Sequence, residues 1–138
     1  MEAEASVMVV DDDEDIREVV KLTLEVGGYR VTTAADGLEA WNHLSLGAPP
    51  PLLILLDLMM PRMDGEKFIK ILRASPQANI AVVIMSGHSA SSQKTEQLGA
   101  NGCLTKPVDM DELLRTVRRV ISSNRLRNQQ ANVRRENA

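Results

Sequence analysis

Acidic, hydroxyl and basic side chains directly follow four strongly apolar stretches of the sequence. These are Asp11 and Asp12 after residues 6–10, Asp57 after 52–56, Ser86 after 80–85 and Lys106 after 102–105. Carboxylates are the hard oxygen ligands that Mg²⁺ prefers. An ammonium and a hydroxyl suit the oxygens of a phosphoryl group, and a carboxylate can accept that group covalently. The residue types therefore predict metal-assisted phosphoryl chemistry, with Asp57 as the nucleophile.

The acidic run at residues 11–15 follows an apolar stretch that should be buried. Two carboxylates about 4 Å apart repel by about 4 kcal/mol at an effective dielectric near 20. Solvent exposure, a helix N-terminus or a bound cation would each offset that repulsion. We assign Asp13, Glu14 and Asp15 to the start of a helix, and Asp11 and Asp12 to a cation site.

The remaining candidate positions are judged by their surroundings. Asp57 ends the most apolar stretch of the chain, where an ionised carboxylate is poorly tolerated without a counter-charge. Ser86 could cap a following helix instead of binding a ligand, and Lys106 could be an ordinary solvated lysine. Gly87 leaves room beside Ser86 for an approaching group.

The apolar pattern alternates between two periods. Strand-like runs at 6–10, 30–33, 52–56, 80–85 and 102–105 are separated by stretches with helical spacing, of which 89–98 is mostly polar and gives the weakest signal. Asp36 and Glu39, like Asp109 and Glu112, have the spacing of a capping box. The alternation predicts βαβ units, and hence a doubly wound α/β fold with a five-stranded parallel sheet between two helical layers.

This fold would bring the candidate residues together. Ligands of open parallel α/β sheets bind at the carboxyl ends of the strands. Every candidate residue follows a predicted strand, so all of them should meet at one edge of the sheet.

Composition limits the class of protein. A length of 138 residues, with 43% hydrophobic and 25% charged residues, is typical of one globular domain. The longest apolar run is too short to span a bilayer and the N-terminus is acidic, so we expect a cytoplasmic protein without a membrane partner. The single cysteine and two histidines exclude an intramolecular disulfide and a Cys/His zinc site.

Charge divides the chain into two parts. The net charge is −3, and the last 17 residues carry +3, so residues 1–121 carry −6. The acidic body argues against nucleic-acid binding by the folded core. We predict a folded domain at 1–121 and a polar, arginine-containing extension at 122–138, in which the last helix ends and then frays.

Two other classes of protein do not fit the sequence. Haloacid-dehalogenase-type phosphohydrolases need a second aspartate two residues after the nucleophile, and that position is Met59. The glycine-rich phosphate-binding motifs of nucleotide-binding proteins follow none of the predicted strands.

Four motifs in order carry a family resemblance. "VMVVDDDEDIR", "LLDLMMPRMDG", "IMSG" and "GCLTKP" resemble the receiver domain of two-component response regulators, over residues 5 to about 121. The resemblance implies a flavodoxin-like (βα)5 fold with strand order 2-1-3-4-5, an order that periodicity does not supply.

The resemblance also implies roles. Asp57 would be the phosphoacceptor and Asp12 a direct Mg²⁺ ligand, with Asp11 acting through water and the Met59 carbonyl as a further ligand; Mn²⁺ is the alternative ion. The residues that would bind the phosphoryl group are Ser86, Gly87 and Lys106. The Lys106-Pro107 peptide would be cis.

One position departs from the family pattern. Ser86 and Cys103 occupy the two switch positions, but receivers usually carry Tyr or Phe where this chain has Cys103. Met59 and His88 lie where the family tunes dephosphorylation.

The function implied is signalling rather than separate enzymatic turnover. The chain would take a phosphoryl group from a phosphohistidine on a sensor histidine kinase or phosphotransfer protein, and would catalyse only its own phosphorylation and dephosphorylation. As a stand-alone receiver it would signal by contact with a downstream protein. A degenerate receiver that acts as a scaffold without phosphorylation is the alternative, and the sequence leaves open whether the chain is part of a longer protein.

Overall fold

The computed structural model describes residues 5–47, 49–87 and 92–136, in which strands and helices alternate along the chain. The elements are β1 (Ser6–Val10), α1 (Glu14–Val26), β2 (Arg30–Ala34), α2 (Gly37–Ser45), β3 (Leu53–Asp57), α3 (Gly65–Arg73), β4 (Ala81–Ser86), α4 (Ser92–Gln97), β5 (Gly102–Thr105) and α5 (Met110–Glu136). The predicted alternation is confirmed.

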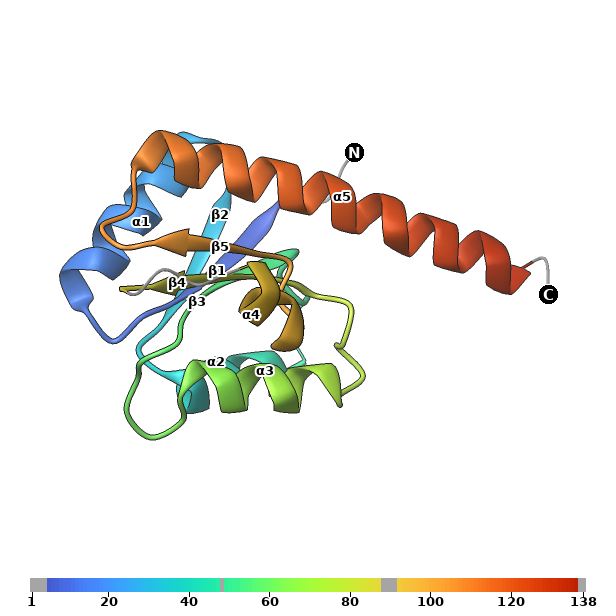
Figure 1. Cartoon of the computed structure of the whole chain (residues 1–138), viewed down its shortest axis with the longest axis horizontal. Coiled ribbons are helices and arrows are strands. Elements are labelled where there is room, and N and C mark those ends of the chain that lie inside the picture. The colour runs from blue at the N-terminus through green and yellow to red at the C-terminus, as the bar shows by residue number, and fades with distance from the viewer. Residues whose placement is uncertain (1–4, 48, 88–91, 137–138) are drawn as a thin grey trace.

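All strand pairs are parallel, and the order across the sheet is β2-β1-β3-β4-β5 (Figure 1). Every residue of β3 and β4 is buried, as expected for central strands covered on both faces. The doubly wound fold and the strand order implied by the family resemblance are both confirmed.

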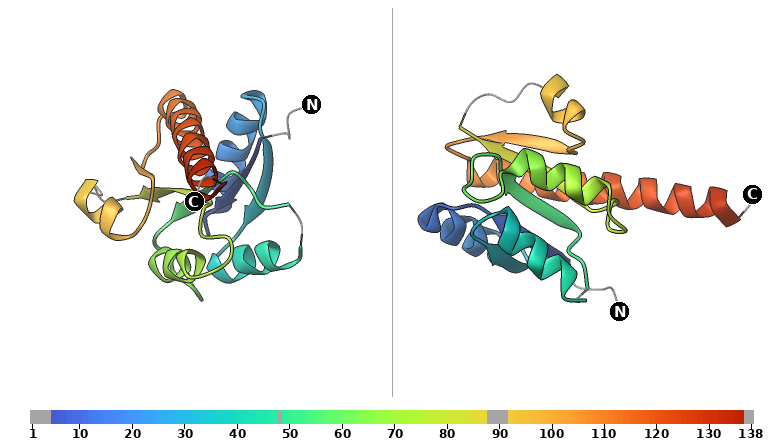
Figure 2. Two further views of the ribbon diagram at one scale, coloured as in Figure 1. Left: turned by 90° about the vertical axis from the view of Figure 1, so that its right-hand side faces the viewer. Right: turned by 90° about the horizontal axis from the view of Figure 1, so that it is seen from below.

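Two apolar clusters cover the two faces of the sheet. Along β1, Val7 and Val9 pack on the face covered by α1 and α5, whereas Met8 and Val10 pack on the face covered by α2 and α3 (Figure 2). This alternation follows from the two-residue period of a strand. Full burial of one large apolar side chain contributes about 2 kcal/mol to the stability of the fold. Each cluster contains many such side chains, and together they fix the sheet whose edge carries the candidate residues.

Aspartates cap four of the described helices. Asp13, Asp36 and Asp109 each accept a backbone N–H at the start of the helix that follows, as the sequence predicts, and Asp64 does the same for α3. Asp13 thus belongs to the entrance of α1, with Glu14 and Asp15 in its first turn.

Some element boundaries differ from the sequence prediction. Strands β3 and β4 each begin and end one residue later than expected, so Asp57 and Ser86 are the last residues of their strands. Their backbones still pair across the sheet, Asp57 with Met85 and Ser86 with Thr105. In the weakly helical stretch 89–98, helix α4 spans six residues, and positions 89–91 lie outside the described residues.

Helix α5 is helical through the predicted extension as far as Glu136, and projects well beyond the sheet (Figure 1). Its first half is anchored by buried Leu113, Val117 and Ile121. Farther on, Asn124 Nδ2 donates a hydrogen bond of 2.8 Å to the Asn79 carbonyl. The division of the chain at residue 121 stays a prediction. Among the described helices, none combines the length and apolar character needed to cross a membrane.

Candidate functional site

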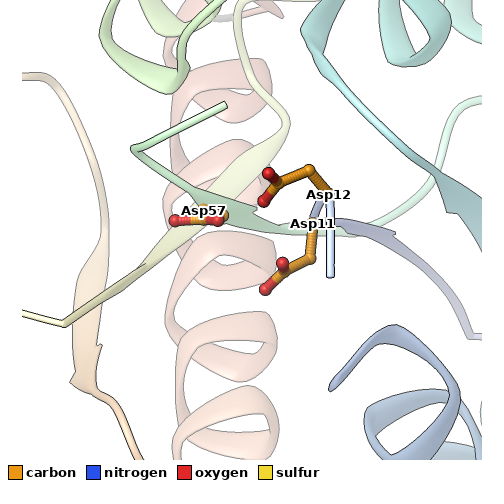
Figure 3. Close-up of side chains that lie close together, drawn as sticks. All are labelled: Asp11, Asp12 and Asp57. Atoms are coloured by element: carbon orange, nitrogen blue, oxygen red, sulfur yellow. The ribbon is translucent and has the colours of Figure 1, made fainter. Parts of the chain in front are cut away.

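Three carboxylates converge at the carboxyl edge of the sheet (Figure 3). Each of Asp11, Asp12 and Asp57 offers one oxygen, and these atoms lie within 4.8 Å of one another. The sheet explains their closeness, because β1 and β3 are adjacent and Val10 pairs with Leu56 immediately before the acids. The predicted acidic cluster is therefore present.

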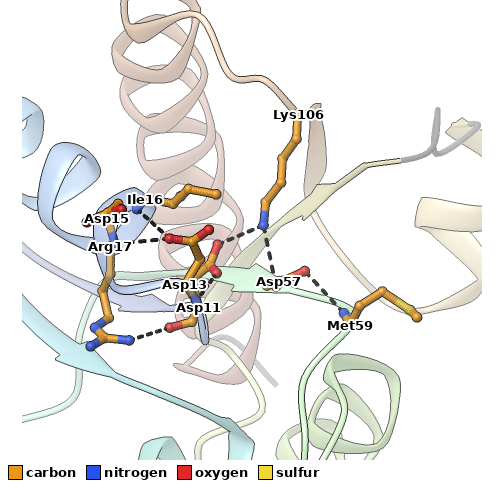
Figure 4. Close-up of polar contacts among 8 residues, drawn as sticks. All are labelled: Asp11, Asp13, Asp15, Ile16, Arg17, Asp57, Met59 and Lys106. Atoms are coloured by element: carbon orange, nitrogen blue, oxygen red, sulfur yellow. Dashed lines mark hydrogen bonds and ion pairs between the residues drawn. The ribbon is translucent and has the colours of Figure 1, made fainter.

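The cluster is largely removed from water. Asp11 is fully buried and Asp57 is 4% exposed, whereas Asp12 faces solvent. Asp11 Oδ1 accepts the Asp13 N–H at 2.9 Å, and the Asp11 carbonyl accepts a 2.8 Å hydrogen bond from Arg17 Nη1 (Figure 4). Sequence analysis did not identify Arg17, whose position on α1 resembles that of any surface arginine.

Lys106 supplies the positive charge of the site. Its Nζ atom lies 2.9 Å from Asp11 Oδ2 and 3.4 Å from Asp57 Oδ2 (Figure 4). Its backbone N–H donates to the Ser86 carbonyl, which joins the ends of β4 and β5. Although burial acts to lower it, the two carboxylates hold the pKa of Lys106 above its ordinary value. The lysine therefore stays charged.

The pKa of Asp57 is raised above its ordinary value. Burial is the largest cause and the neighbouring charge of Asp11 adds to it, while the Met59 N–H and Lys106 oppose the shift. Because the folded pKa exceeds the unfolded one, the stability associated with this carboxyl is complete below the unfolded pKa, and is lost as pH rises through the folded pKa. Ionisation of Asp57 in the metal-free protein thus destabilises the fold.

Neutralising Asp57 is expected to stabilise the protein at neutral pH. In metal-free buffer, Asp57→Asn should unfold at a higher temperature than the wild type, because it removes a buried charge beside Asp11. The difference should shrink as pH falls toward the ordinary aspartate value of 3.8, where the wild-type carboxyl is itself protonated. Calorimetric unfolding across this pH range tests the prediction. Equal unfolding temperatures at neutral pH would contradict it.

The residues present fit a divalent cation. Asp11 Oδ2 is buried and accepts no hydrogen bond of good geometry from the described part of the chain, so its charge is met only as an ion pair with Lys106. Three carboxylates lie beside the Lys106 ammonium, and the Arg17 guanidinium is bound to the Asp11 backbone carbonyl, so negative charge remains in excess and a divalent ion would offset it. Hard oxygen donors in this number suit Mg²⁺, which commonly keeps several waters.

The loop after β3 is held close to Asp57. The Met59 N–H donates to Asp57 Oδ1 at 3.1 Å, while the Met59 side chain is 74% exposed. Gly65 begins α3 against this point, and a Cβ there would lie 2.6 Å from the Asp57 carbonyl oxygen. Only glycine permits this approach of α3 to the site.

The other predicted positions are placed as follows. Ser86 is buried at the end of β4, and a Cβ added at Gly87 would meet no atom within 4 Å, so there is open space beside Ser86. The Lys106-Pro107 peptide is cis, as the family resemblance implies. Cys103 is half-buried on β5 and packs toward the cluster that includes α2 and α3. His88 lies outside the described residues.

The sequence matches a known family. The response regulator receiver domain family matches residues 7–118. Response regulator MprA of Mycobacterium ulcerans is 32% identical over 127 residues, which are 91% of this chain and 53% of that protein. Response regulator Rre1 of Synechocystis is 35% identical over 121 residues, 85% of this chain and 52% of that protein. The chain thus spans about half the length of these curated relatives.

Solved structures agree with the sequence match. Chemotaxis protein CheY4 of Vibrio cholerae superposes with a TM-score of 0.78 at 36% identity, over 86% of this chain and 99% of that chain. The family match covers most of the folded part, including the β1, β3, β4 and β5 ends that carry the acidic cluster and Lys106. The chain therefore belongs to the response regulator receiver domain family of two-component signal transduction.

Proposed function

We propose that Asp57 accepts a phosphoryl group from a phosphohistidine donor and that the modified domain signals by protein–protein contact. The observation that carries the proposal is the convergence of Asp11, Asp12 and Asp57 within 4.8 Å, next to Lys106 at the carboxyl edge of the sheet. Membership of the receiver domain family supports the proposal, because receiver domains generally accept the phosphoryl group from a sensor histidine kinase or a phosphotransfer protein.

The proposed reaction is a simple displacement. An Asp57 carboxylate oxygen forms a bond to phosphorus as the phosphorus–nitrogen bond to the donor imidazole breaks, and the released imidazole takes a proton from solvent. Water later attacks the same phosphorus and returns the Asp57 carboxylate and inorganic phosphate. The domain would thus catalyse only its own phosphorylation and dephosphorylation.

The other residues would bind and orient the transferred group. Lys106, which pairs with the Asp57 carboxylate before transfer, would pair with the phosphoryl oxygens afterwards. The Ser86 hydroxyl would donate a hydrogen bond to the same oxygens, in the open space beside Gly87. Asp11, Asp12 and the Met59 carbonyl, together with Asp57, would hold Mg²⁺ or Mn²⁺. The bound ion would neutralise charge on the phosphoryl oxygens.

Labelling with a small phosphodonor tests the proposal. The protein is incubated with acetyl phosphate and Mg²⁺, and its intact mass is measured. We expect the mass of one added phosphoryl group, and no addition when EDTA is added beforehand, because the acidic cluster needs its cation. Failure of the wild type to label while a control receiver does would favour the alternative of a non-phosphorylated scaffold.

Output would pass through the face made by α4, β5 and α5, where Ser86 and Cys103 occupy the switch positions. Phosphorylation would bias a two-state equilibrium of this face. Cys103 offers less surface than the usual aromatic residue, so the switch would depend more on the backbone of β5 than on a rotating ring.

A further inference from the structure

A separate ion pair lies at the far side of the loop that leaves the site, residues 58–64, called the β3–α3 loop below. Arg62 Nε lies 2.6 Å and Arg62 Nη2 lies 2.5 Å from Asp36 Oδ2. Asp36 precedes α2 and is 4% exposed. The ion pair therefore ties the loop after the phosphoacceptor to the start of a helix 26 residues earlier in the chain.

Asp36 has separate partners for its two oxygens. Oδ1 accepts the Glu39 N–H at 2.9 Å and so caps α2, while Oδ2 binds Arg62. Burial acts to raise the pKa of Asp36, but the Glu39 N–H and Arg62 hold it below its ordinary value. The carboxylate is thus charged when it holds the loop, and the helix cap fixes its orientation.

The backbone of the loop tip needs an external tie. Arg62 has a φ of 62°, in the left-handed region that costs free energy for a residue other than glycine. The Gly37 N–H donates to the Met63 carbonyl at 3.3 Å, and a Cβ at Gly37 would lie 2.7 Å from the same oxygen. The tip therefore rests directly on the N-terminus of α2, and Arg62 adds the charged contact.

The other end of the loop is the candidate metal site. The Met59 N–H is bound to Asp57 Oδ1, and the Gly65 N–H closes the loop onto the Leu58 carbonyl at 3.1 Å. The Met59 N–H is fixed by Asp57, and Arg62 is fixed by Asp36. The Met59 carbonyl therefore belongs to the short stretch of loop between these two contacts.

We infer that Arg62 and Asp36 are positioning residues of the metal site: their ion pair holds the β3–α3 loop so that the Met59 carbonyl is ready as an oxygen ligand. The inference rests on the proposed function, which places Mg²⁺ between Met59 and the acidic cluster. It adds two residues that touch neither the ion nor the phosphoryl group.

Magnesium titration of Arg62→Ala tests the inference. Affinity is measured from the amide chemical shifts of the wild type and the variant. We expect Mg²⁺ to bind about 10-fold more weakly to the variant, the effect of losing a residue that orients a metal ligand. Alanine shares the left-handed strain of arginine at this position, so only the side-chain contact is removed. Arg62→Lys, which keeps the charge, should recover part of the affinity.

Two further variants identify the pair as the cause. Asp36→Asn keeps an oxygen for the α2 cap but loses the charge, and should weaken Mg²⁺ binding as Arg62→Ala does. The double variant should be no worse than either single variant, because both remove the same contact. Lys70→Ala is the matched control, since Lys70 forms an exposed ion pair with Glu66 on α3, and its affinity should equal that of the wild type.

The outcomes separate this inference from the proposed function. If the wild type binds no Mg²⁺, the proposed function fails. If the wild type binds Mg²⁺ and Arg62→Ala binds it equally well, only the inference is overturned, even where the variant unfolds at a lower temperature. Additive losses in the double variant would also overturn it, because they would show that the two residues act separately.

Discussion

Asp57→Asn is expected to reduce the rate of labelling by acetyl phosphate by about 1000-fold or more. Asparagine keeps the size and planarity of aspartate but has no anionic oxygen to attack phosphorus. Asp11 and Asp12 are not equivalent replacements. Asp11 is fully buried against Lys106, and Asp12 is on the solvent side of the cluster.

The measurement is the intact mass after incubation with Mg²⁺ and the donor. Asp64→Asn is the matched control, because Asp64 caps the nearby α3 through Oδ1, a role that the asparagine oxygen can keep. This control should label like the wild type. Persistent labelling of Asp57→Asn would assign the phosphoacceptor to another residue.

Arg73→Ala is expected to give a large loss of stability, about 3 kcal/mol, which lowers the unfolding temperature by about 10 °C. The guanidinium donates to the carbonyls of Ala78 and Ile80 at 2.6 Å and of Gly99 at 2.9 Å, and to Asn101 Oδ1 at 3.1 Å. It thus joins the end of α3 to the segments before β4 and β5. Arg73 is half-buried, and this burial lowers its pKa below the ordinary arginine value.

The alanine variant leaves several backbone acceptors without a donor, and this is the cause of the expected loss. Arg73→Lys should recover less than half of it, because one ammonium cannot span acceptors that a planar guanidinium reaches together. Arg119→Ala, at an exposed position on α5, should change stability by less than about 0.5 kcal/mol. Chemical denaturation measures all three. A loss for Arg73→Ala no greater than for Arg119→Ala would contradict the prediction.

The strands, the helices and the position of the site at the carboxyl edge of the sheet can be predicted from the local pattern of apolar and polar residues. Apolar runs such as that at β3 are long and unbroken, and the acids stand directly at their ends. The strand order cannot be derived in this way, because the alternation of strands and helices permits several orders. The family resemblance supplies the order. The last strand residues were also missed, because Asp57 and Ser86 are polar while their backbones still pair in the sheet.

Long-range side-chain contacts could not be predicted. The spacing of Asp36 and Glu39 predicts a helix cap, but nothing in the sequence indicates that the second oxygen of Asp36 binds Arg62. Arg73 lies in the last turn of α3, where a basic residue is common for local reasons. Its partners come from later segments of the chain. The length of α5 was hidden by the polarity of residues 122–136, although arginine, glutamine and alanine there favour helix.

The long last helix also has a mechanical consequence. A straight helix rises about 1.5 Å per residue, so the 12 residues from 125 to 136 form an arm of about 18 Å beyond the contact of Asn124 with Asn79. A tilt of α5 by about 5° at the sheet would move the far end by about 2 Å. The arm therefore magnifies small changes near β5, and a probe attached near residue 131 would report them more sensitively than one on the body.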